Sequence, residues 1–86
     1  MVWIETPTNP NLKITDIAAA AELCKARGVS LIIDNTFASP SLQKPIEFGA
    51  TAVLHSVSKY IGGHSDTIMG AICMNDEEMH AKLRYL

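Results

Sequence analysis

A strand–helix–strand pattern in its N-terminal part constrains the fold of this chain more than any other feature of its sequence. The apolar runs Val2–Ile4 and Val29–Ile33 flank the stretch Ile17–Cys24, in which apolar residues recur at helical spacing. Asp16 stands at the N-cap position of that helix, and Gly28 follows its end. Strand, helix and strand joined by such short connections form a βαβ unit, which predicts a parallel sheet with a right-handed crossover.

The remainder of the chain continues the alternation of strands and helices. Residues 42–48 predict a single helical turn, and residues 52–55 predict a third strand. Residues 67–74 predict a fourth strand, in which Gly70 indicates a bulge or a close backbone approach. The fold class is therefore α/β, a mostly parallel sheet with flanking helices. The acidic run 76–78 after Asn75 predicts the start of a last helix with three apolar residues on one face, Met79, Leu83 and Leu86.

The size and composition of the chain limit its class. We expect residues 1–86 to be a single partial domain, because so short a chain buries only about 60% of the surface that its unfolded form exposes. The net charge of −2 argues against nucleic acid or an anionic membrane as a partner. No apolar run reaches the roughly 18 residues that span a bilayer. Cys24 and Cys73 form neither a C-x-x-C pair nor a disulfide framework, so we expect two buried free thiols and a cytoplasmic location.

Each of the three predicted parallel strands is followed by a polar or ionisable residue. Asn9, Asp34 and Lys59 are equally spaced, about one βαβ unit apart. Ligands of open parallel sheets bind outside the carboxyl ends of the strands, where loops and helix N-termini converge. We therefore expect these three side chains at one edge of the sheet, together with the hydroxyls of Ser56 and Ser58.

These groups together suit pyridoxal 5′-phosphate (PLP) as a cofactor. Lys59 can trap a carbonyl when its surroundings favour the neutral amine, and Ser56 and Ser58 can hold a phosphate. A lysine Schiff base combined with an aspartate on the pyridinium nitrogen is how proteins bind PLP, and Asp34 supplies that aspartate. Simpler explanations exist, because Asp34 can start a turn, the serines can cap a helix and Lys59 can be a solvated charge. A Schiff-base enzyme without PLP leaves the aspartate and the serines unexplained.

Other kinds of site have less support in the sequence. The three histidines, at positions 55, 64 and 80, lack metal-ligand spacing with one another or with the cysteines, so we expect no metal site. The adjacent residues His64, Ser65 and Asp66 cannot form a catalytic triad, because they cannot all face one another. The pair Gly62-Gly63 lacks the G-x-G-x-x-G spacing of a dinucleotide-binding loop.

Three segments of the chain resemble the Cys/Met-metabolism family of PLP-dependent enzymes, which carry out transsulfuration. The segments are ETPTNP at residues 5–10, DNTF at residues 34–37 and SVSKYIGGHSD at residues 56–66. The last is similar to the cofactor-lysine signature of that family, and the resemblance runs through essentially all 86 residues. Ser58 replaces the threonine that members commonly carry before the lysine, but it keeps the hydroxyl.

The resemblance implies a role for each candidate residue. Lys59 would form the Schiff base with PLP and later move protons on the substrate. Asp34 would pair with the pyridinium nitrogen, and Asn9 would lie near the 3′-oxygen of the ring. Three hydroxyl residues would complete these contacts, Ser56 and Ser58 on the phosphate and Thr36 close to the cofactor.

The resemblance also implies a fold and an activity for the parent protein. The fold is the large PLP-binding domain of the aspartate-aminotransferase type (fold type I), with residues 67–74 as the antiparallel strand of its sheet. The activity is elimination at Cγ of a cystathionine-type sulfur amino acid, giving cysteine, 2-oxobutanoate and ammonia. Replacement at Cγ and elimination from methionine need the same groups and remain open. The implied parent is a longer homotetramer built from dimers with shared active sites. The N-terminal segment and the C-terminal domain of that family are absent from residues 1–86, so we expect this part alone to be inactive. The alternative is an inactive fragment with no formed cofactor site.

Overall fold

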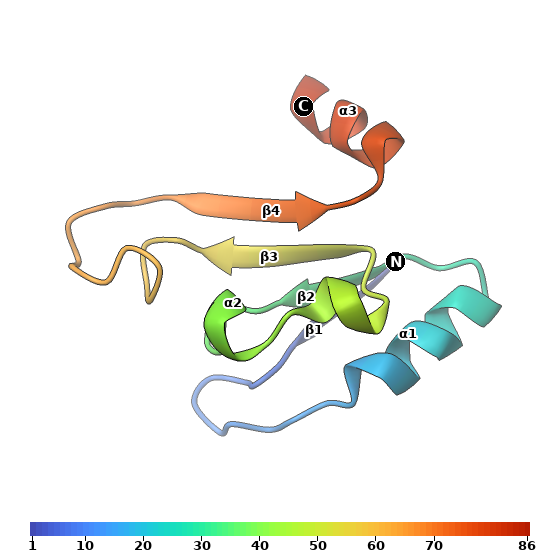
Figure 1. Cartoon of the computed structure of the whole chain (residues 1–86), viewed down its shortest axis with the longest axis horizontal. Coiled ribbons are helices and arrows are strands. Elements are labelled where there is room, and N and C mark those ends of the chain that lie inside the picture. Colours follow the sequence, from blue (N-terminus) through green and yellow to red (C-terminus); the bar gives the residue numbers. More distant parts are fainter.

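The computed structural model describes all 86 residues, which form a four-stranded sheet with three helices (Figure 1). The strands lie side by side in chain order, and β1 pairs in parallel with β2, as β2 does with β3. Strand β4 runs antiparallel to β3. The predicted α/β class, the mostly parallel sheet and the antiparallel last strand are confirmed. The bounds are β1 (Val2–Glu5), β2 (Leu31–Asp34), β3 (Ala52–Ser56) and β4 (Gly70–Met74).

Helix α1 (Ile17–Ala26) connects β1 to β2 and supplies one side of the core. Its predicted caps are present. The Asp16 carboxylate accepts a hydrogen bond from the backbone nitrogen of Ala19 at 3.0 Å, and Gly28 ends the helix with a φ of +63°. The apolar positions predicted for α1 face the sheet, and burial of this face stabilises the βαβ unit. The buried cluster consists of Ile17, Ala21, Cys24, Leu31, Ile33, Ala50 and Val53.

The second strand begins later than the sequence predicts. The backbone nitrogen of Val29 donates to the oxygen of Cys24 at 2.9 Å, so this residue completes the end of α1 instead of joining the sheet. Between β2 and β3 lie a short helix, α2 (Ser39–Leu42), and a 3₁₀ turn (Pro45–Phe48). The prediction of a single turn there was too simple. Two prolines, each near the start of its turn, separate the segment into two pieces.

The prediction of a bulge or close approach at Gly70 was wrong. Gly70 is the first residue of β4 and pairs with Ser56 in a register that continues one to one to the end of the strand. A side chain at Gly70 would place its Cβ 3.8 Å from the nearest atom, the backbone oxygen of His55, which is an ordinary contact. The strand begins at Gly70 because the backbone of Met69 is bonded to Ser58.

The prediction of a buried thiol holds for Cys24 but not for Cys73. Cys24 lies in the core, whereas Cys73 is exposed. Cys73 pairs with Val53 across the sheet, but it sits on β4, which is the last strand of the sheet. Its apolar strand pattern gave no sign that this strand lies at an edge.

The last helix, α3 (Glu77–Tyr85), begins where the acidic run predicts. Asp76 is its N-cap and accepts a hydrogen bond from the backbone nitrogen of Met79 at 2.9 Å. No residue of α3 is buried, so the predicted apolar face does not pack into the core. None of the helices has both the length and the apolar character that crossing a bilayer requires.

Candidate active site

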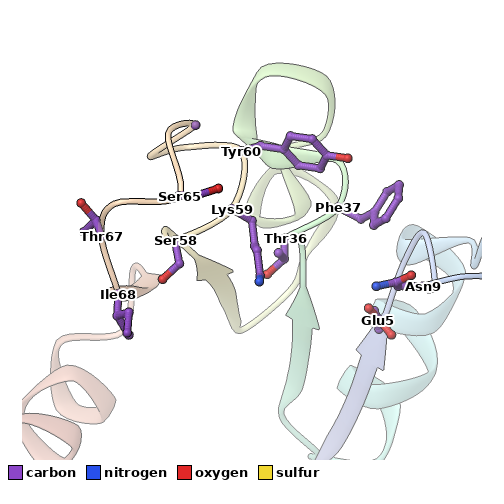
Figure 2. Close-up of a pocket in the computed structure, with 11 residues that line it drawn as sticks. Glu5, Asn9, Thr36, Phe37, Ser58, Lys59, Tyr60, Ser65, Thr67 and Ile68 are labelled. Carbon is purple, nitrogen blue, oxygen red and sulfur yellow. The ribbon is translucent and has the colours of Figure 1, made fainter.

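A hollow of about 570 Å³ lies at the carboxyl ends of the three parallel strands (Figure 2). The segments that follow β1, β2 and β3 contribute to its lining, and residues just before β4 complete it. The edge predicted to collect polar side chains is therefore concave. Its eleven lining residues are Glu5, Asn9, Thr36, Phe37, Ser58, Lys59, Tyr60, Gly63, Ser65, Thr67 and Ile68.

Lys59 projects into this hollow from a tight turn after β3. Figure 2 shows its side chain extended on the side of Thr36. The turn is fixed by the backbone: the nitrogen of Lys59 donates to the oxygen of Ser56 at 3.1 Å, and its oxygen accepts from Gly63 at 2.8 Å. The lysines that form ion pairs are Lys44 and Lys82, at other places on the surface. The Lys59 amine has no hydrogen-bond or ion-pair partner and is free to react with a ligand.

Thr36 connects two predicted site residues that do not themselves line the hollow. Its hydroxyl oxygen accepts a hydrogen bond from the backbone nitrogen of Ser56 at 2.8 Å. Its own backbone nitrogen donates to a carboxylate oxygen of Asp34 at 3.0 Å. Asp34 and Ser56 are both half-buried at the ends of β2 and β3. The Asp34 contact is the turn that the simpler explanation predicts, and it leaves the second carboxylate oxygen unbonded.

The Ser58 hydroxyl is bonded to the segment that leads into β4. It accepts a hydrogen bond from the backbone nitrogen of Met69 at 2.8 Å and donates to the oxygen of Met69 at 3.2 Å. The backbone nitrogen of Ser58 also donates to that oxygen, at 3.1 Å. Residues 58 and 69 therefore close the loop that carries Lys59, a role for the serine that its position before the lysine does not reveal.

Asn9, on the segment after β1, lines the hollow as predicted, and so does Glu5, the last residue of β1, which was not predicted. The sequence predicts that β1 ends at Ile4, but the strand continues for one more residue. Glu5 thereby becomes the direct neighbour of Asp34 in the parallel register. A carboxylate directly after an apolar strand was the signal that could have identified it.

An aromatic pair and a second group of hydroxyls also line the hollow and were missed. The rings of Phe37 and Tyr60 meet edge to face, with centroids 5.8 Å apart and an interplanar angle of 81°. Tyr60 follows Lys59 directly, so its position next to the lysine was a usable signal. Ser65, which has a φ of +56°, and Thr67 come from the loop before β4, whose path no local pattern predicts.

Of the predicted site residues, the structure therefore places one group in the hollow and another behind it. Asn9, Thr36, Ser58 and Lys59 line it. Asp34 and Ser56 lie at the adjoining strand ends and connect to it through Thr36.

Comparison with known proteins identifies the family of the chain. The family model described as "Cys/Met metabolism PLP-dependent enzyme" matches residues 1–86. Cystathionine gamma-lyase of Dictyostelium discoideum is 55% identical over 86 residues, which are 100% of this chain and 22% of the relative. Cystathionine gamma-synthase of Mycobacterium tuberculosis is also 55% identical over 86 residues, with the same coverage of 100% and 22%. The chain belongs to the Cys/Met-metabolism family of PLP-dependent enzymes.

Solved structures share the fold of the chain closely. The structure of cystathionine gamma-lyase from Lactobacillus plantarum, complexed with L-serine, is 53% identical with a TM-score of 0.94. It covers 96% of this chain, and this chain covers 22% of it. The structure of a methionine gamma lyase from Micromonospora echinospora is 46% identical with a TM-score of 0.95, covering 96% and 23%. The chain spans 22% of the length of the Dictyostelium and Mycobacterium relatives.

The groups around the hollow fit PLP, the cofactor of this family. The Lys59 amino group, which has no hydrogen-bond partner, suits the cofactor aldehyde, and the hydroxyls that line the hollow suit its phosphate. The amide of Asn9 can donate to a ring oxygen. The half-buried carboxylate of Asp34 stands one strand away from Lys59, where a protonated ring nitrogen needs an anion.

Proposed function

We propose that residues 1–86 are the central part of the PLP-binding domain of a longer transsulfuration enzyme. The observation that carries the proposal is the free Lys59 amine in a hollow lined by hydroxyls and an amide, at the carboxyl ends of parallel strands. Membership of a PLP-dependent family supports it. When bound, PLP supplies an electron sink for a carbanion at the substrate Cα.

The residues of the chain would divide the work of binding and proton transfer. Lys59 would hold the cofactor through its Nζ atom until the substrate amine takes its place, and the released amine would then accept the proton from Cα and return it at a later step. Asp34 would keep the ring nitrogen protonated, and Asn9 would fix the ring orientation by a hydrogen bond. Ser56 and Ser58 would contribute hydroxyls to the phosphate, and Thr36 would lie close to the cofactor.

The reaction that we propose first is that of a cystathionine γ-lyase. Cystathionine and water would give cysteine, 2-oxobutanoate and ammonia, with the bond from sulfur to Cγ broken. Replacement at Cγ, as in a cystathionine γ-synthase, and elimination from methionine are the alternatives. A lyase and a synthase among the relatives have equal identity to the chain, so the choice between them needs an assay. The intact protein should be tested on cystathionine, methionine and an activated homoserine, and turnover of none would overturn the transsulfuration assignment.

We propose a cytoplasmic homotetramer of dimers with shared active sites as the working assembly. Trp3 on β1 and Ile72 on β4 are 55% and 50% exposed, which leaves apolar surface on both outer strands for other parts of the protein. The same exposure supports the expectation that residues 1–86 alone are inactive. Sedimentation of the intact protein tests the assembly, and a monomer with full activity would contradict it.

Reductive labelling tests the cofactor site directly. The protein is incubated with PLP, reduced with borohydride and mapped by mass spectrometry. The proposal expects selective labelling of Lys59, with the other lysines as internal controls. Asp34→Asn is the matched variant, because it removes the charge but keeps an oxygen that can accept from Thr36. Labelling of the intact protein at every lysine except Lys59 would overturn the proposal. The other lysines within residues 1–86 are Lys13, Lys25, Lys44 and Lys82.

A further inference from the structure

A side-chain amide behind the hollow bridges the loop after β1, which carries Asn9, and the loop after β2, which begins at Asp34 and carries Thr36. The Nε2 atom of Gln43 donates to the backbone oxygen of Thr6 and to Oδ1 of Asn35, both at 2.8 Å. The Nδ2 atom of Asn35 donates in return to the backbone oxygen of Gln43 at 2.8 Å.

Both partners of Gln43 are completely buried, at 0% exposure. The loop after β1 is fixed further by Thr6, whose hydroxyl accepts from the backbone nitrogen of Thr15 at 3.0 Å. The loop after β2 is fixed by Asn35, whose backbone nitrogen donates to the oxygen of Leu54 at 2.9 Å. Directly between the two loops, the backbone nitrogen of Thr6 lies 3.3 Å from the oxygen of Asp34, a long hydrogen bond. The Gln43 amide supplies the shorter connection.

The chemistry of a primary amide explains why glutamine occupies this position. One nitrogen carries two hydrogens, so Gln43 can serve an acceptor on each loop at the same time. A carboxylate at the same place would face two oxygens without a hydrogen to share. An apolar side chain of similar length would leave both buried acceptors without this donor.

We propose that Gln43 is a positioning residue, which sets the spacing between Asn9 on the loop after β1 and both Asp34 at the end of β2 and Thr36 on the loop that follows it. Gln43 does not line the hollow, so it acts only through these neighbours. Thr6 precedes Asn9 by three residues, and Asn35 lies between Asp34 and Thr36. The inference rests on the proposed function, because the spacing matters through the PLP ring that these side chains would hold.

A double-mutant cycle in the intact protein carrying residues 1–86 tests this role. Gln43→Met removes both donated hydrogen bonds and keeps the length of the side chain. We expect the PLP dissociation constant, measured by titration of the visible absorbance, to rise about tenfold. In the Asn9→Ala background, Gln43→Met should raise the PLP dissociation constant by less than about twofold, because the side chain that Gln43 positions is already absent. If Gln43→Met raises the PLP dissociation constant by the same factor in both backgrounds, Gln43 acts on folding alone and the proposal is overturned.

Two further variants keep the test decisive. Thr51→Val is the matched control, because the Thr51 hydroxyl accepts from the backbone nitrogen of Leu31 at 3.0 Å, at the opposite end of the strands. It should lower thermal stability and leave PLP affinity unchanged. If Gln43→Met does not fold, Asn35→Ala removes both side-chain hydrogen bonds between Asn35 and Gln43 without adding a buried charge, and it should weaken PLP binding about threefold, again with little effect in the Asn9→Ala background. An intact wild-type protein that folds but does not bind PLP at Lys59 overturns the proposed function, whereas unchanged binding by both Gln43→Met and Asn35→Ala overturns only the role of Gln43.

Discussion

The hydroxyl of Thr36 lies 2.8 Å from the backbone nitrogen of Ser56 and accepts its hydrogen bond. This contact connects the loop after β2 to the end of β3, one turn before Lys59. The backbone nitrogen of Thr36 is bonded to Asp34, so a single residue relates the carboxylate to the strand that delivers the lysine. The placement of the lysine relative to the aspartate therefore depends on a side chain as well as on the sheet.

Replacement of Thr36 by valine tests that dependence. Thr36→Val keeps the shape but leaves the half-buried Ser56 nitrogen without its acceptor, which should lower the free energy of unfolding by about 1–2 kcal/mol. Chemical denaturation of the chain measures this change. Thr36→Ser keeps the oxygen and should stay within about 0.5 kcal/mol of the wild type. Equal destabilisation by both variants would contradict the prediction, because Thr36→Ser keeps the hydroxyl that accepts from Ser56.

Comparison of PLP with pyridoxal separates two roles of Ser58. Its hydroxyl closes the lysine loop through Met69, so Ser58→Ala should weaken uptake of both compounds at Lys59, by about tenfold, since Met69 loses its acceptor. Pyridoxal lacks the phosphate, so loss of a serine that only contacts the phosphate would leave pyridoxal uptake unchanged. Ser58→Thr retains the hydroxyl and serves as the control. Reductive labelling gives both values, and a loss confined to PLP would contradict the loop-closing role.

The sequence predicts the parts of the site that follow from strand periodicity. The three parallel strands end at the same sheet edge, which is why Asn9 and Lys59 were expected at one edge, where both line the hollow. Such reasoning works because strand ends are local features, recognisable from an apolar run and the break that follows it.

The contacts that arrange the site depend on residues distant in the chain. Gln43 reaches Thr6 across 37 positions, and Ser58 reaches Met69 across 11. No periodicity records these pairs, because they depend on where loops cross after the sheet has formed. The misplacement of Cys73 has the same origin, since an apolar strand pattern does not say whether the strand will lie at the edge of the sheet.

The two helix caps should differ in their effect on stability. Asp16 caps α1, which buries three residues in the core, whereas Asp76 caps α3, which buries none. Asp16→Ala should therefore lower the free energy of unfolding of the chain by about 1 kcal/mol. Asp76→Ala should only speed hydrogen exchange in α3 and leave the main unfolding transition unchanged. Asn at either position keeps the acceptor and should restore the wild-type behaviour. An equal shift of the main transition by both alanine variants would mean that α3 unfolds together with the sheet.

Gly62 should be needed for the turn that presents Lys59. A Cβ there would lie 2.8 Å from the backbone oxygen of Val57, and the nitrogen of Gly62 already donates to that same oxygen at 2.7 Å. The turn cannot open to admit a methyl group without breaking this bond, so Gly62→Ala should reduce PLP labelling of Lys59 about tenfold.

Gly28→Ala is the matched control for this prediction. Gly28 has a φ of +63°, and a methyl group at its Cα would meet no other atom within 4 Å. Alanine there therefore costs only about 1 kcal/mol of backbone strain, at the end of α1 and away from the hollow. It should lower thermal stability and leave labelling of Lys59 unchanged. A contradicting result would be wild-type labelling of Lys59 in Gly62→Ala while Gly28→Ala is destabilised as expected. The turn would then tolerate the added methyl group, and its shape would not be what presents the Lys59 amine.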